Sequence, residues 1–344
     1  MDSFLLDKIV CSMEKLPLEV KGNHLLSPGG YKYPLIDNVP IMLLDDVEQT
    51  IGVAKESLNL GKKSNSSHDD NLYLSSLGIS EEEKKGLMNL FQNNKSEIDP
   101  AVSFLIAATN GNMYKHLIGN LNSYPIPDMD IVPVCDGSNK SLLDIGCNWG
   151  RWTMAAARKG YKSVGIDPSL GAVMAARRVA NQEGISNCYL VADSRYLPFR
   201  DKTFDVVFSY SVFQHMNYEN LIQSLKEIGR VLKNGGVSYI QMANKKGFVS
   251  LLRQVKRRKR SPINFEVRYW DLEEMLYMFE QYIGKTNIYV DCFFGLGIQK
   301  SDLYLMPITK KFFIYFSEIL KNTANYIPVL KRFADSVFLK SIKS

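Results

Sequence analysis

The sequence predicts an α/β protein built around a doubly wound, mostly parallel β-sheet. From residue 141 onward, short apolar runs of strand length alternate with longer segments of helical periodicity. The first run, 141–145, turns at once through two glycines into a helix, and each of the first three runs is closed by an aspartate. Because doubly wound sheets bind ligands at the carboxyl ends of their strands, we expect these acids to share one edge.

The individual elements follow from changes of periodicity along the chain. Strands are expected at 141–145, 163–167, 187–191, 205–210 and 236–242, with helices at 150–159, 169–183, 218–232 and 271–282. Two more strands, 286–292 and 302–306, are expected to close the sheet. Apolar side chains at helical spacing then predict two amphipathic C-terminal helices, packed on the core or facing a membrane or partner. They are Phe312, Phe313, Phe316 and Leu320, then Leu330, Phe333, Val337 and Phe338.

The N-terminal part is less regular. Strand-like pieces at 17–20 and 39–44 are separated by the turn residues 27–30, which predicts a compact segment over 1–46. The polar tract 61–71 has the composition of a linker, and helical periodicity returns at 81–91 and 101–118.

Composition restricts the class of protein. The chain has 344 residues, 45% of them hydrophobic, which is enough for a sizeable core. Its five cysteines form no Cys-x-x-Cys pair, so neither a disulfide framework nor a zinc knuckle is expected. The first residues lack the basic start of a signal peptide, and no apolar run is long enough to span a bilayer. These features predict a cytoplasmic protein that is soluble or peripheral to the membrane.

Charge is concentrated in one place. The whole chain carries a net charge of +6, yet six basic residues fall within 253–260. Such a run is typical of a solvated helix face, and otherwise of a surface that meets nucleic acid or anionic lipid headgroups.

The acids at the strand ends indicate the ligand. Asp144 lies two residues before Gly146, where a carboxylate suits a cationic ligand better than a pyrophosphate. Asp167 suits the two hydroxyls of a ribose, and Asp193, next to Ser194, an adenine amino group. Glycines 146 and 150 allow close approach of the backbone. S-adenosylmethionine, with its ammonium and sulfonium charges, satisfies this set.

At these motifs the chain resembles the class I S-adenosylmethionine-dependent methyltransferases, of the type 11 kind. The resemblance extends through 193–208 and 229–236 and covers about 140–243. It implies a seven-stranded Rossmann-like sheet and a methyltransferase activity. Asn148 departs from the glycine common at its position, although Asn tolerates unusual backbone angles. The expected cofactor-binding residues are Asp144, Gly146, Asn148, Gly150, Arg151, Asp167, Asp193, Ser194 and Tyr210. Arg151, and Trp149 with it, could instead brace the loop.

The first 46 residues are similar to a small zinc-ribbon module of the Trm112 type. The resemblance rests on 17–20 and 33–43. Its four metal positions correspond here to Cys11, Glu14, Ser27 and Gly30, which cannot hold tetrahedral zinc. We therefore expect a metal-free remnant, and stoichiometric zinc would refute this. The expected organisation is 1–46 for this segment, 47–130 for a linker and helical cap, 131–306 for the S-adenosylmethionine-binding catalytic domain, and 307–344 for the C-terminal helices.

Catalysis by methyl transfer needs alignment more than many reactive groups. His215, just after the fourth strand, is a candidate general base for a hydroxyl acceptor, or else a structural residue of that turn. The long excursion 241–270 carries candidate acceptor-binding side chains, which could equally anchor the next helix. They are Glu266, Arg268, Tyr269 and Trp270.

The basic run, the amphipathic tail and the side chains of 241–270 together favour a glycan or lipid-linked acceptor. We expect O-methylation of a sugar, glycan or secondary-metabolite hydroxyl, with possible membrane-surface contact through 253–260 and the C-terminal helices. Methylation of RNA, such as tRNA, is the alternative suggested by the basic run, and a catalytically silent scaffold subunit is another. A nicotinamide oxidoreductase is disfavoured because Gly-x-Gly-x-x-Gly is missing. The sequence leaves the oligomeric state open.

Overall fold

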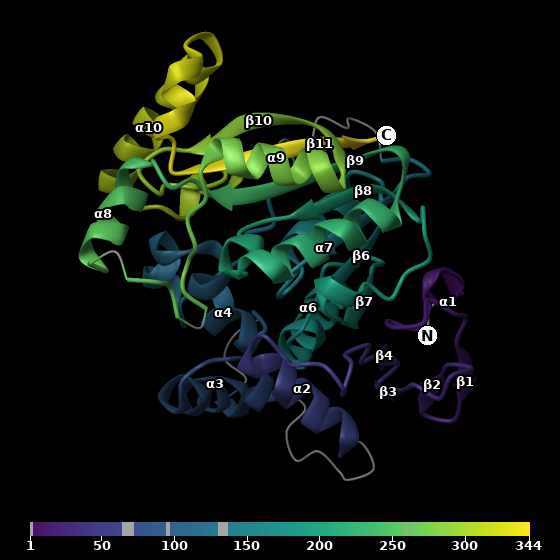
Figure 1. Cartoon of the computed structure of the whole chain (residues 1–344). Coiled ribbons are helices and arrows are strands. Elements are labelled where there is room, and N and C mark those ends of the chain that lie inside the picture. Colours follow the sequence, from purple (N-terminus) through teal and green to yellow (C-terminus); the bar gives the residue numbers. More distant parts are fainter. Residues whose placement is uncertain (1–2, 64–71, 94–96, 130–136, 259, 264) are drawn as a thin grey trace. The chain divides into compact units, whose positions relative to one another are not determined.

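The computed structural model describes residues 3–63, 72–93, 97–129, 137–258, 260–263 and 265–344 (Figure 1). The chain forms two compact units, Met1–Thr203 and Phe204–Ser344.

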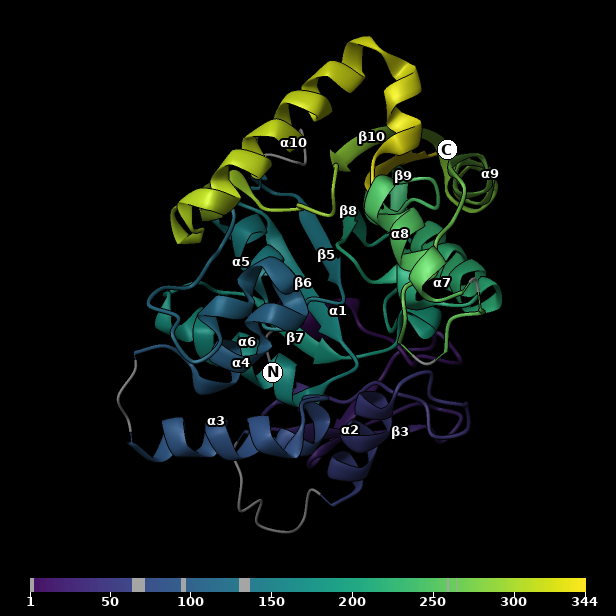
Figure 2. The ribbon, with the colours of Figure 1, turned by 90° about the vertical axis from the view of Figure 1, so that its left-hand side faces the viewer.

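The first unit is built on three parallel strands in the order β5-β6-β7. Almost every side chain in them is buried, as expected of parallel strands covered by helices on their faces (Figure 2). The register pairs Asp144 with Gly165 and Asp167 with Val191. The elements are β5 Ser141–Ile145, α5 Arg151–Arg158, β6 Lys162–Asp167, α6 Leu170–Gln182 and β7 Cys188–Val191.

Helices that precede this sheet pack on α6. Ser57 accepts a hydrogen bond from the N–H of Leu170 at 2.9 Å, and Ser76 accepts one from Gly171 at 2.8 Å. The two serines thus satisfy amides of the first turn of α6 that have no partner within the helix. These elements are α2 Gly52–Lys62, η1 Leu74–Ser76, α3 Glu81–Asn93, α4 Pro100–Asn110 and η2 Asn112–Leu117. The helix predicted over 101–118 is therefore interrupted, at Gly111 with φ 97°.

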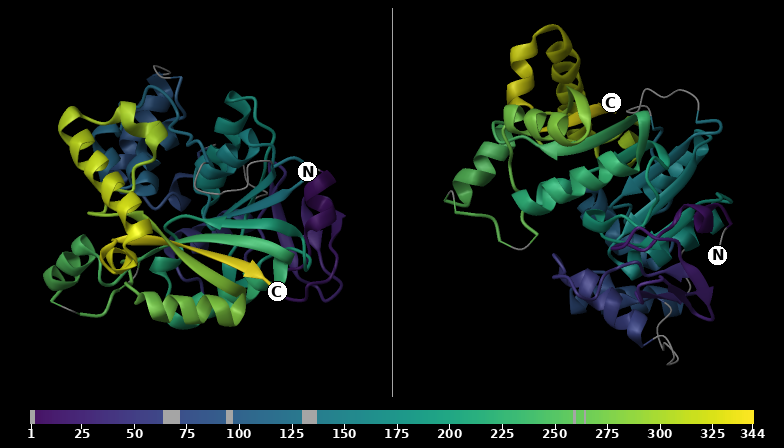
Figure 3. Two further views of the ribbon diagram at one scale, coloured as in Figure 1. Left: turned by 90° about the horizontal axis from the view of Figure 1, so that it is seen from above. Right: turned by 45° about the vertical axis from the view of Figure 1, so that its right-hand side comes forward.

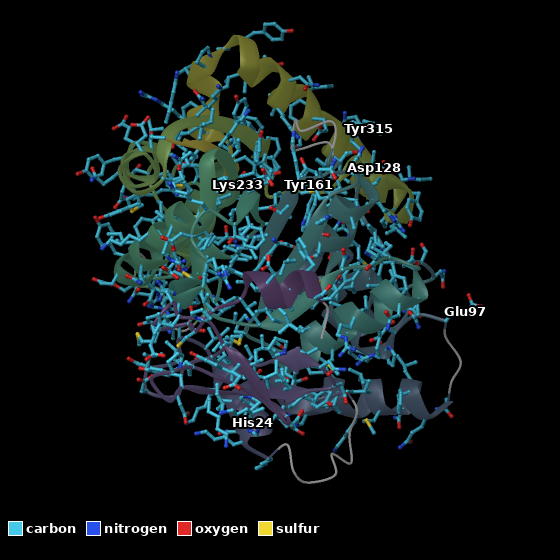
Figure 4. The ribbon with its side chains drawn as sticks, turned by 90° about the vertical axis from the view of Figure 1, so that its right-hand side faces the viewer. His24, Glu97, Asp128, Tyr161, Lys233 and Tyr315 are labelled. Atoms are coloured by element: carbon cyan, nitrogen blue, oxygen red, sulfur yellow. The ribbon has the colours of Figure 1, made fainter. Side chains whose placement is uncertain are left out.

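A small antiparallel sheet in the order β1-β2-β3-β4 follows the N-terminal helix. It is joined to the edge of β7, where Met42 N donates to the Val191 carbonyl at 2.7 Å. Its strands are shorter than the sequence predicts, and His24 on β2 is labelled in Figure 4. The elements are α1 Ser3–Lys8, β1 Glu19–Lys21, β2 His24–Leu26, β3 Lys32–Ile36 and β4 Val39–Pro40.

The second unit contains four strands in the order β10-β11-β9-β8. Strands β8 and β9 are parallel, whereas β11 runs antiparallel between β9 and β10 (Figure 3). The strands are β8 Phe204–Ser209, β9 Leu232–Ala243, β10 Gly284–Cys292 and β11 Ser336–Lys343. The helices are η4 Phe213–His215, α7 Tyr218–Val231, α8 Phe248–Lys256, α9 Leu272–Tyr282, η5 Lys300–Leu305, α10 Ile308–Tyr326 and η6 Pro328–Phe333.

The sheet order over all seven strands is β10-β11-β9-β8-β5-β6-β7. The predicted fold class is thereby confirmed: this is an α/β fold with a mixed, mostly parallel seven-stranded sheet.

Two expectations about the C-terminal part are wrong. The second amphipathic helix is absent, because 336–343 forms β11. This strand lies between two others, and its apolar side chains face both sides of the sheet. Its sequence therefore lacks the alternation of apolar and polar residues that identifies a strand with one exposed face. The strand expected at 302–306 is replaced by the 3₁₀ helix η5. The linker expected at 61–71 falls largely outside the described residues.

Candidate functional site

The loop between β5 and α5 has an unusual backbone. Gly146, Asn148 and Gly150 all have positive φ, at 75°, 47° and 80°. A Cβ on Gly150 would lie 2.6 Å from the Tyr189 hydroxyl, so this position also requires the absence of a side chain. The Asn148 side chain accepts a hydrogen bond from Trp149 N at 2.8 Å. Asn148 therefore substitutes for glycine because Asn adopts the left-handed region more readily than most residues.

Asp144, near the end of β5, is buried and receives a hydrogen bond from inside the protein. Thr153, in the first turn of α5, donates its hydroxyl to Asp144 Oδ2 at 2.6 Å. Burial raises the pKa of Asp144 to about 7, the Thr153 bond opposes this rise, and the nearby Asp167 adds to it.

Asp167, at the end of β6, binds backbone amides on both sides of the site. Its Oδ2 accepts from Asn148 N at 3.0 Å and its Oδ1 from Ser169 N at 2.9 Å. Burial raises its pKa to about 6, although both amide bonds act in the opposite direction. The carboxylate thus fixes the glycine loop against the start of α6.

These two acids form an anionic pair without a cationic partner. In the part of the chain that the structure describes, neither Asp144 nor Asp167 forms an ion pair. A buried carboxylate is costly unless it is paired. A ligand with an ammonium and a sulfonium group would supply the missing positive charge. The residues present therefore fit S-adenosylmethionine on grounds of charge.

The third acid, Asp193, follows β7 and is engaged differently. Arg195 binds both its oxygens, with the backbone N at 2.8 Å from Oδ1 and Nη2 at 2.7 Å from Oδ2. The same guanidinium donates to the Glu48 carbonyl at 2.8 Å. Ser194, next in sequence, is buried. The Asp193 carboxylate thus already has a cationic partner, which the sequence analysis missed although Arg195 stands only two residues away.

The aromatic residue of the loop is fully enclosed. Trp149 packs beside Tyr124, with ring centroids 6.1 Å apart, and its indole Nε1 has no acceptor among the described residues. Arg151 is also buried, and its guanidinium lies 5.3 Å from the Trp152 ring. Both side chains thus pack inside the protein beside the loop, and the indole N–H remains able to donate to a ligand.

The remaining predicted residues belong to the second unit. The Tyr210 hydroxyl lies 3.3 Å from Asp291 Oδ2, on a buried carboxylate that also accepts from Ser336 at 2.7 Å and Gln241 at 3.2 Å. Burial raises the pKa of Asp291. No sequence motif indicates this cluster, because its members come from four separate segments.

His215 lies in η4 and is held by the segment that follows α8. Its Nδ1 is 2.7 Å from the Phe265 carbonyl, and its ring stacks on that of Phe265 with centroids 3.9 Å apart. Arg268 Nη1 donates to the His215 carbonyl at 2.5 Å. Burial and the nearby Arg268 charge lower the pKa of His215, whereas backbone hydrogen bonds at Phe265 and Ser211 raise it.

The four candidate acceptor residues make mostly internal contacts. Glu266 pairs with Arg260 at 2.6 Å, which lowers the pKa of the glutamate to about 2. The Arg257 guanidinium lies over the Tyr269 ring, 5.6 Å from its centroid. Trp270 is buried, and its ring centroid lies 6.2 Å from that of Tyr218. Arg268 contacts η4 through the His215 carbonyl, and Trp270 contacts α7 through Tyr218, so these two residues anchor the segment.

Comparison with known proteins identifies the family. The family described as "Methyltransferase domain" matches residues 143–240, which include the glycine loop and the three acids. An uncharacterised protein of Methanocaldococcus jannaschii is 31% identical over 206 residues, 54% of this chain and 73% of that protein. The chain belongs to the class I S-adenosylmethionine-dependent methyltransferases. Its methyl donor is therefore S-adenosylmethionine, and it is an enzyme that requires a methyl acceptor.

Other relatives of this methyltransferase are matched over shorter stretches. A ubiquinone biosynthesis O-methyltransferase of Pelagibacter ubique is 33% identical over 107 residues, 31% of this chain and 43% of that protein. Less than half of that relative is thus spanned. Among solved structures, a Thermotoga maritima protein described as a possible histamine N-methyltransferase is 18% identical, with a TM-score of 0.40, covering 60% of this chain and 83% of that one.

The structure also describes the N-terminal segment of this methyltransferase. Cys11 Sγ lies 3.2 Å from the Tyr33 hydroxyl and accepts a hydrogen bond from Glu14 N at 3.4 Å. Within the described ranges, no three His, Cys, Asp or Glu side chains gather in a way that could hold a metal ion. None of the helices in those ranges has both the length and the apolar character needed to cross a bilayer.

Proposed function

We propose that this methyltransferase O-methylates a hydroxyl of a sugar, glycan or secondary-metabolite acceptor, with His215 as the general base. The hydrogen bond between His215 Nδ1 and the Phe265 carbonyl is the observation that carries this proposal. A carbonyl oxygen only accepts hydrogen bonds, so Nδ1 donates to Phe265 and is protonated. In the neutral ring the lone pair then lies on Nε2, which can take the proton of a hydroxyl.

The surroundings of His215 favour this neutral form. Burial lowers its pKa below the ordinary value of 6.5, so the neutral ring predominates at pH 7. Stacking on Phe265 and the bond from Arg268 fix the orientation of the turn. Phe265 and Arg268 therefore act as positioning residues.

The first unit would hold the methyl donor. Asp144 would face its cationic amino-acid end, Asp167 its ribose and Asp193 with Ser194 its adenine, while Gly146, Asn148, Gly150 and Arg151 would form the loop. Bound there, S-adenosylmethionine supplies an electrophilic methyl group for in-line displacement. We assign Tyr210 to the same cofactor set.

The acceptor would be bound by the segment that follows α8. We assign its binding to Glu266, Arg268, Tyr269 and Trp270, of which Trp270 has an indole N–H without an acceptor in the described part of the chain. A curated relative named for O-methylation supports an oxygen nucleophile. We further propose a cytoplasmic enzyme whose residues 1–46 are a metal-free Trm112-like remnant.

The proposed domain boundaries are those predicted from the sequence, except that the C-terminal segment does not form two helices. We propose 1–46, 47–130 and 131–306 as the functional divisions. The segment 307–344 would then contribute α10 as an accessory helix and β11 as part of the sheet.

The experiment follows tritium from methyl-labelled S-adenosylmethionine into a total lipid extract, a glycan fraction and bulk tRNA. We expect label in lipid or glycan as a methyl ether, and its transfer should fall by roughly 10²- to 10⁴-fold in His215→Gln. Affinity for S-adenosylmethionine should not change, and His116→Gln serves as the matched control. Unchanged transfer in His215→Gln would exclude its role as base.

Methylation of RNA is the second candidate, and one observation favours it. Five basic side chains of 253–260 line a single depression on the surface, as a phosphate backbone would require. Label that appears in tRNA nucleosides instead of lipid or glycan would select this function. Label in none of the three fractions, despite binding of S-adenosylmethionine, would point to a small water-soluble secondary metabolite as the acceptor.

A further inference from the structure

Helix α10 carries apolar side chains on its outward face as well as on its packed face. Ile314, Ser317 and Ala324 are buried, and Ser317 bonds to the backbone of Phe293 just after β10. The opposite side is formed by exposed residues at spacings of four, three, four and seven, which share one helix face. They are Ile308 (85% exposed), Phe312 (72%), Tyr315 (57%), Ile319 (60%) and Tyr326 (87%). Tyr315 is labelled in Figure 4.

This pattern differs from that of an ordinary surface helix. A helix of a globular protein exposes its polar face and buries its apolar one. Here apolar side chains lie on the exposed face as well as on the side that packs against β10 and η6. An exposed apolar stripe of this extent marks an interaction surface.

Helix α8 combines exposed apolar residues with the basic run. Phe248, Leu251, Leu252 and Val255 are exposed, the last two by 61% and 63%. The basic depression beside them is lined by Arg253, Lys256, Arg257, Arg258 and Arg260. Glu266 pairs with two of these, Arg257 and Arg260. The other three have no acidic partner among the residues that the structure describes.

An aromatic stack joins the two helices into one surface. The Phe248 ring of α8 stacks on Phe294 at 5.5 Å and on Phe333 at 5.9 Å. Phe294 in turn stacks on Phe316 of α10 at 5.9 Å. Both helices lie at the end of the second unit where β11 begins, away from the C-terminus (Figures 1 and 3). We call the exposed faces of α8 and α10 together the α8–α10 surface.

The charge of this surface is strongly one-sided. Residues 245–260 contain eight Lys and Arg and no Asp or Glu. Because the whole chain carries +6, the rest of it carries −2. Residues 307–333 add five basic residues and one acid. The occupant must therefore be anionic and must also accept apolar side chains.

We propose that the α8–α10 surface docks the enzyme on an anionic phospholipid bilayer. Basic side chains near an anionic leaflet attract it, while aromatic and aliphatic side chains enter the boundary between headgroups and acyl chains. The phosphates of RNA would pair with the basic side chains, but RNA provides no apolar phase for the aliphatic side chains. These are Leu252, Val255, Ile308 and Ile319. A symmetric dimer through this surface would place the two basic depressions close together, which is unfavourable. The proposal goes beyond the proposed function, since docking requires neither acceptor nor methyl donor.

The test is co-sedimentation of the full chain with vesicles, without acceptor or S-adenosylmethionine. We expect binding to phosphatidylcholine vesicles that contain phosphatidylglycerol and little binding to pure phosphatidylcholine. Each removed cation should weaken binding about fivefold, so Arg253→Gln/Lys256→Gln/Arg258→Gln should lose on the order of a hundredfold. Phe312→Ser/Ile319→Ser should lose binding by more than tenfold while retaining the basic residues.

Matched controls remove equal charge and equal apolar surface elsewhere. Lys55→Gln/Lys85→Gln/Lys202→Gln and Phe91→Ser/Tyr277→Ser replace exposed residues outside the α8–α10 surface and should bind as the unaltered chain does. Equal binding to both vesicle types, or full binding by either surface variant, would overturn the proposal. If the chain does not bind vesicles but binds tRNA, and the basic variant loses that binding, the proposal is also overturned. The same holds if the chain does not bind vesicles but forms a dimer that Phe312→Ser/Ile319→Ser dissociates.

Discussion

Thr153 donates its hydroxyl to the Asp144 carboxylate at 2.6 Å, and this bond is internal to the protein. The Asp144 carboxylate, which we assign to a cationic ligand, is thus oriented in the ligand-free protein. No basic side chain of the described residues forms an ion pair with Asp144. The Thr153 hydroxyl, together with a backbone hydrogen bond at Thr153, partly offsets the effect of burial, which raises the pKa of Asp144 to about 7. The balance between these two residues decides how much negative charge the site offers at neutral pH.

Replacing Thr153 with valine should therefore weaken the folded protein. The change keeps the side-chain shape and removes the donor, which leaves a buried carboxylate under-bonded at a cost of about 1–3 kcal/mol. Urea unfolding of the ligand-free protein at pH 8 measures this cost. Thr153→Ser keeps the hydroxyl and is the control. Equal loss in both variants would show that packing of the methyl group is what matters.

Binding of S-adenosylmethionine should release protons near neutral pH. Ligand-free Asp144 has a pKa of about 7, so roughly half of the molecules carry the proton at that pH. A cation bound beside the carboxylate lowers its pKa and expels the proton. Titration calorimetry at pH 7 in two buffers of different ionisation enthalpy measures the release. Binding should tighten between pH 6 and 8.

Asp144→Asn is the control for this proton release. It should bind S-adenosylmethionine at least tenfold more weakly and show no dependence on the buffer. The folded pKa of Asp144 lies above the ordinary value of 3.8, so its contribution to stability is present below pH 4 and is lost as the pH rises through 7. Ligand-free Asp144→Asn should therefore be more stable than the unaltered protein at pH 8, but not at pH 4. Buffer-independent binding by the unaltered protein would contradict the assignment.

The sequence predicts the cofactor edge of the fold well, because its signals are local. Asp144 and Asp167 each end a buried strand, and Gly146 and Gly150 mark the turn between strand and helix. What the sequence misses are partners that the fold brings from elsewhere. Thr153 lies nine residues after Asp144 with no motif to mark it, and the cluster of Tyr210, Gln241, Asp291 and Ser336 comes from distant segments.

The same distinction explains the error at the C-terminus. Residues 336–343 pair with β9 on one side and β10 on the other, so the strand is specified by two partners more than 40 residues away. Its apolar side chains face both layers and show no alternation. Helix α10 was predicted correctly, because the helical spacing of Phe312, Phe313 and Phe316 is a local signal.

Replacement of Asn148 by glycine should be tolerated better than replacement by alanine. Its φ of 47° is left-handed, a conformation that costs residues with a Cβ roughly 1–2 kcal/mol and glycine nearly nothing. Asn148→Ala should therefore lose about 1 kcal/mol of stability and bind S-adenosylmethionine more weakly. Asn148→Gly should keep both within a few tenths of a kcal/mol, despite losing the bond to Trp149 N. Chemical denaturation measures the stability of the two variants, and calorimetry measures their affinity for S-adenosylmethionine. Equal losses in Asn148→Ala and Asn148→Gly would show that the side-chain bond outweighs the backbone strain.

Asp99 should contribute to stability in two separable ways. As the N-cap of α4 it accepts from Ala101 N at 2.9 Å, and its buried carboxylate pairs with Arg178 of α6, Nε to Oδ2 at 2.5 Å. Asp99→Ala removes both interactions and should cost about 2–4 kcal/mol, because it leaves a partly buried guanidinium unpaired. Asp99→Asn keeps a capping oxygen and should cost less. A double-mutant cycle with Arg178→Gln, followed by urea unfolding, isolates the ion pair, and a coupling energy below about 0.5 kcal/mol would show that capping accounts for the whole effect.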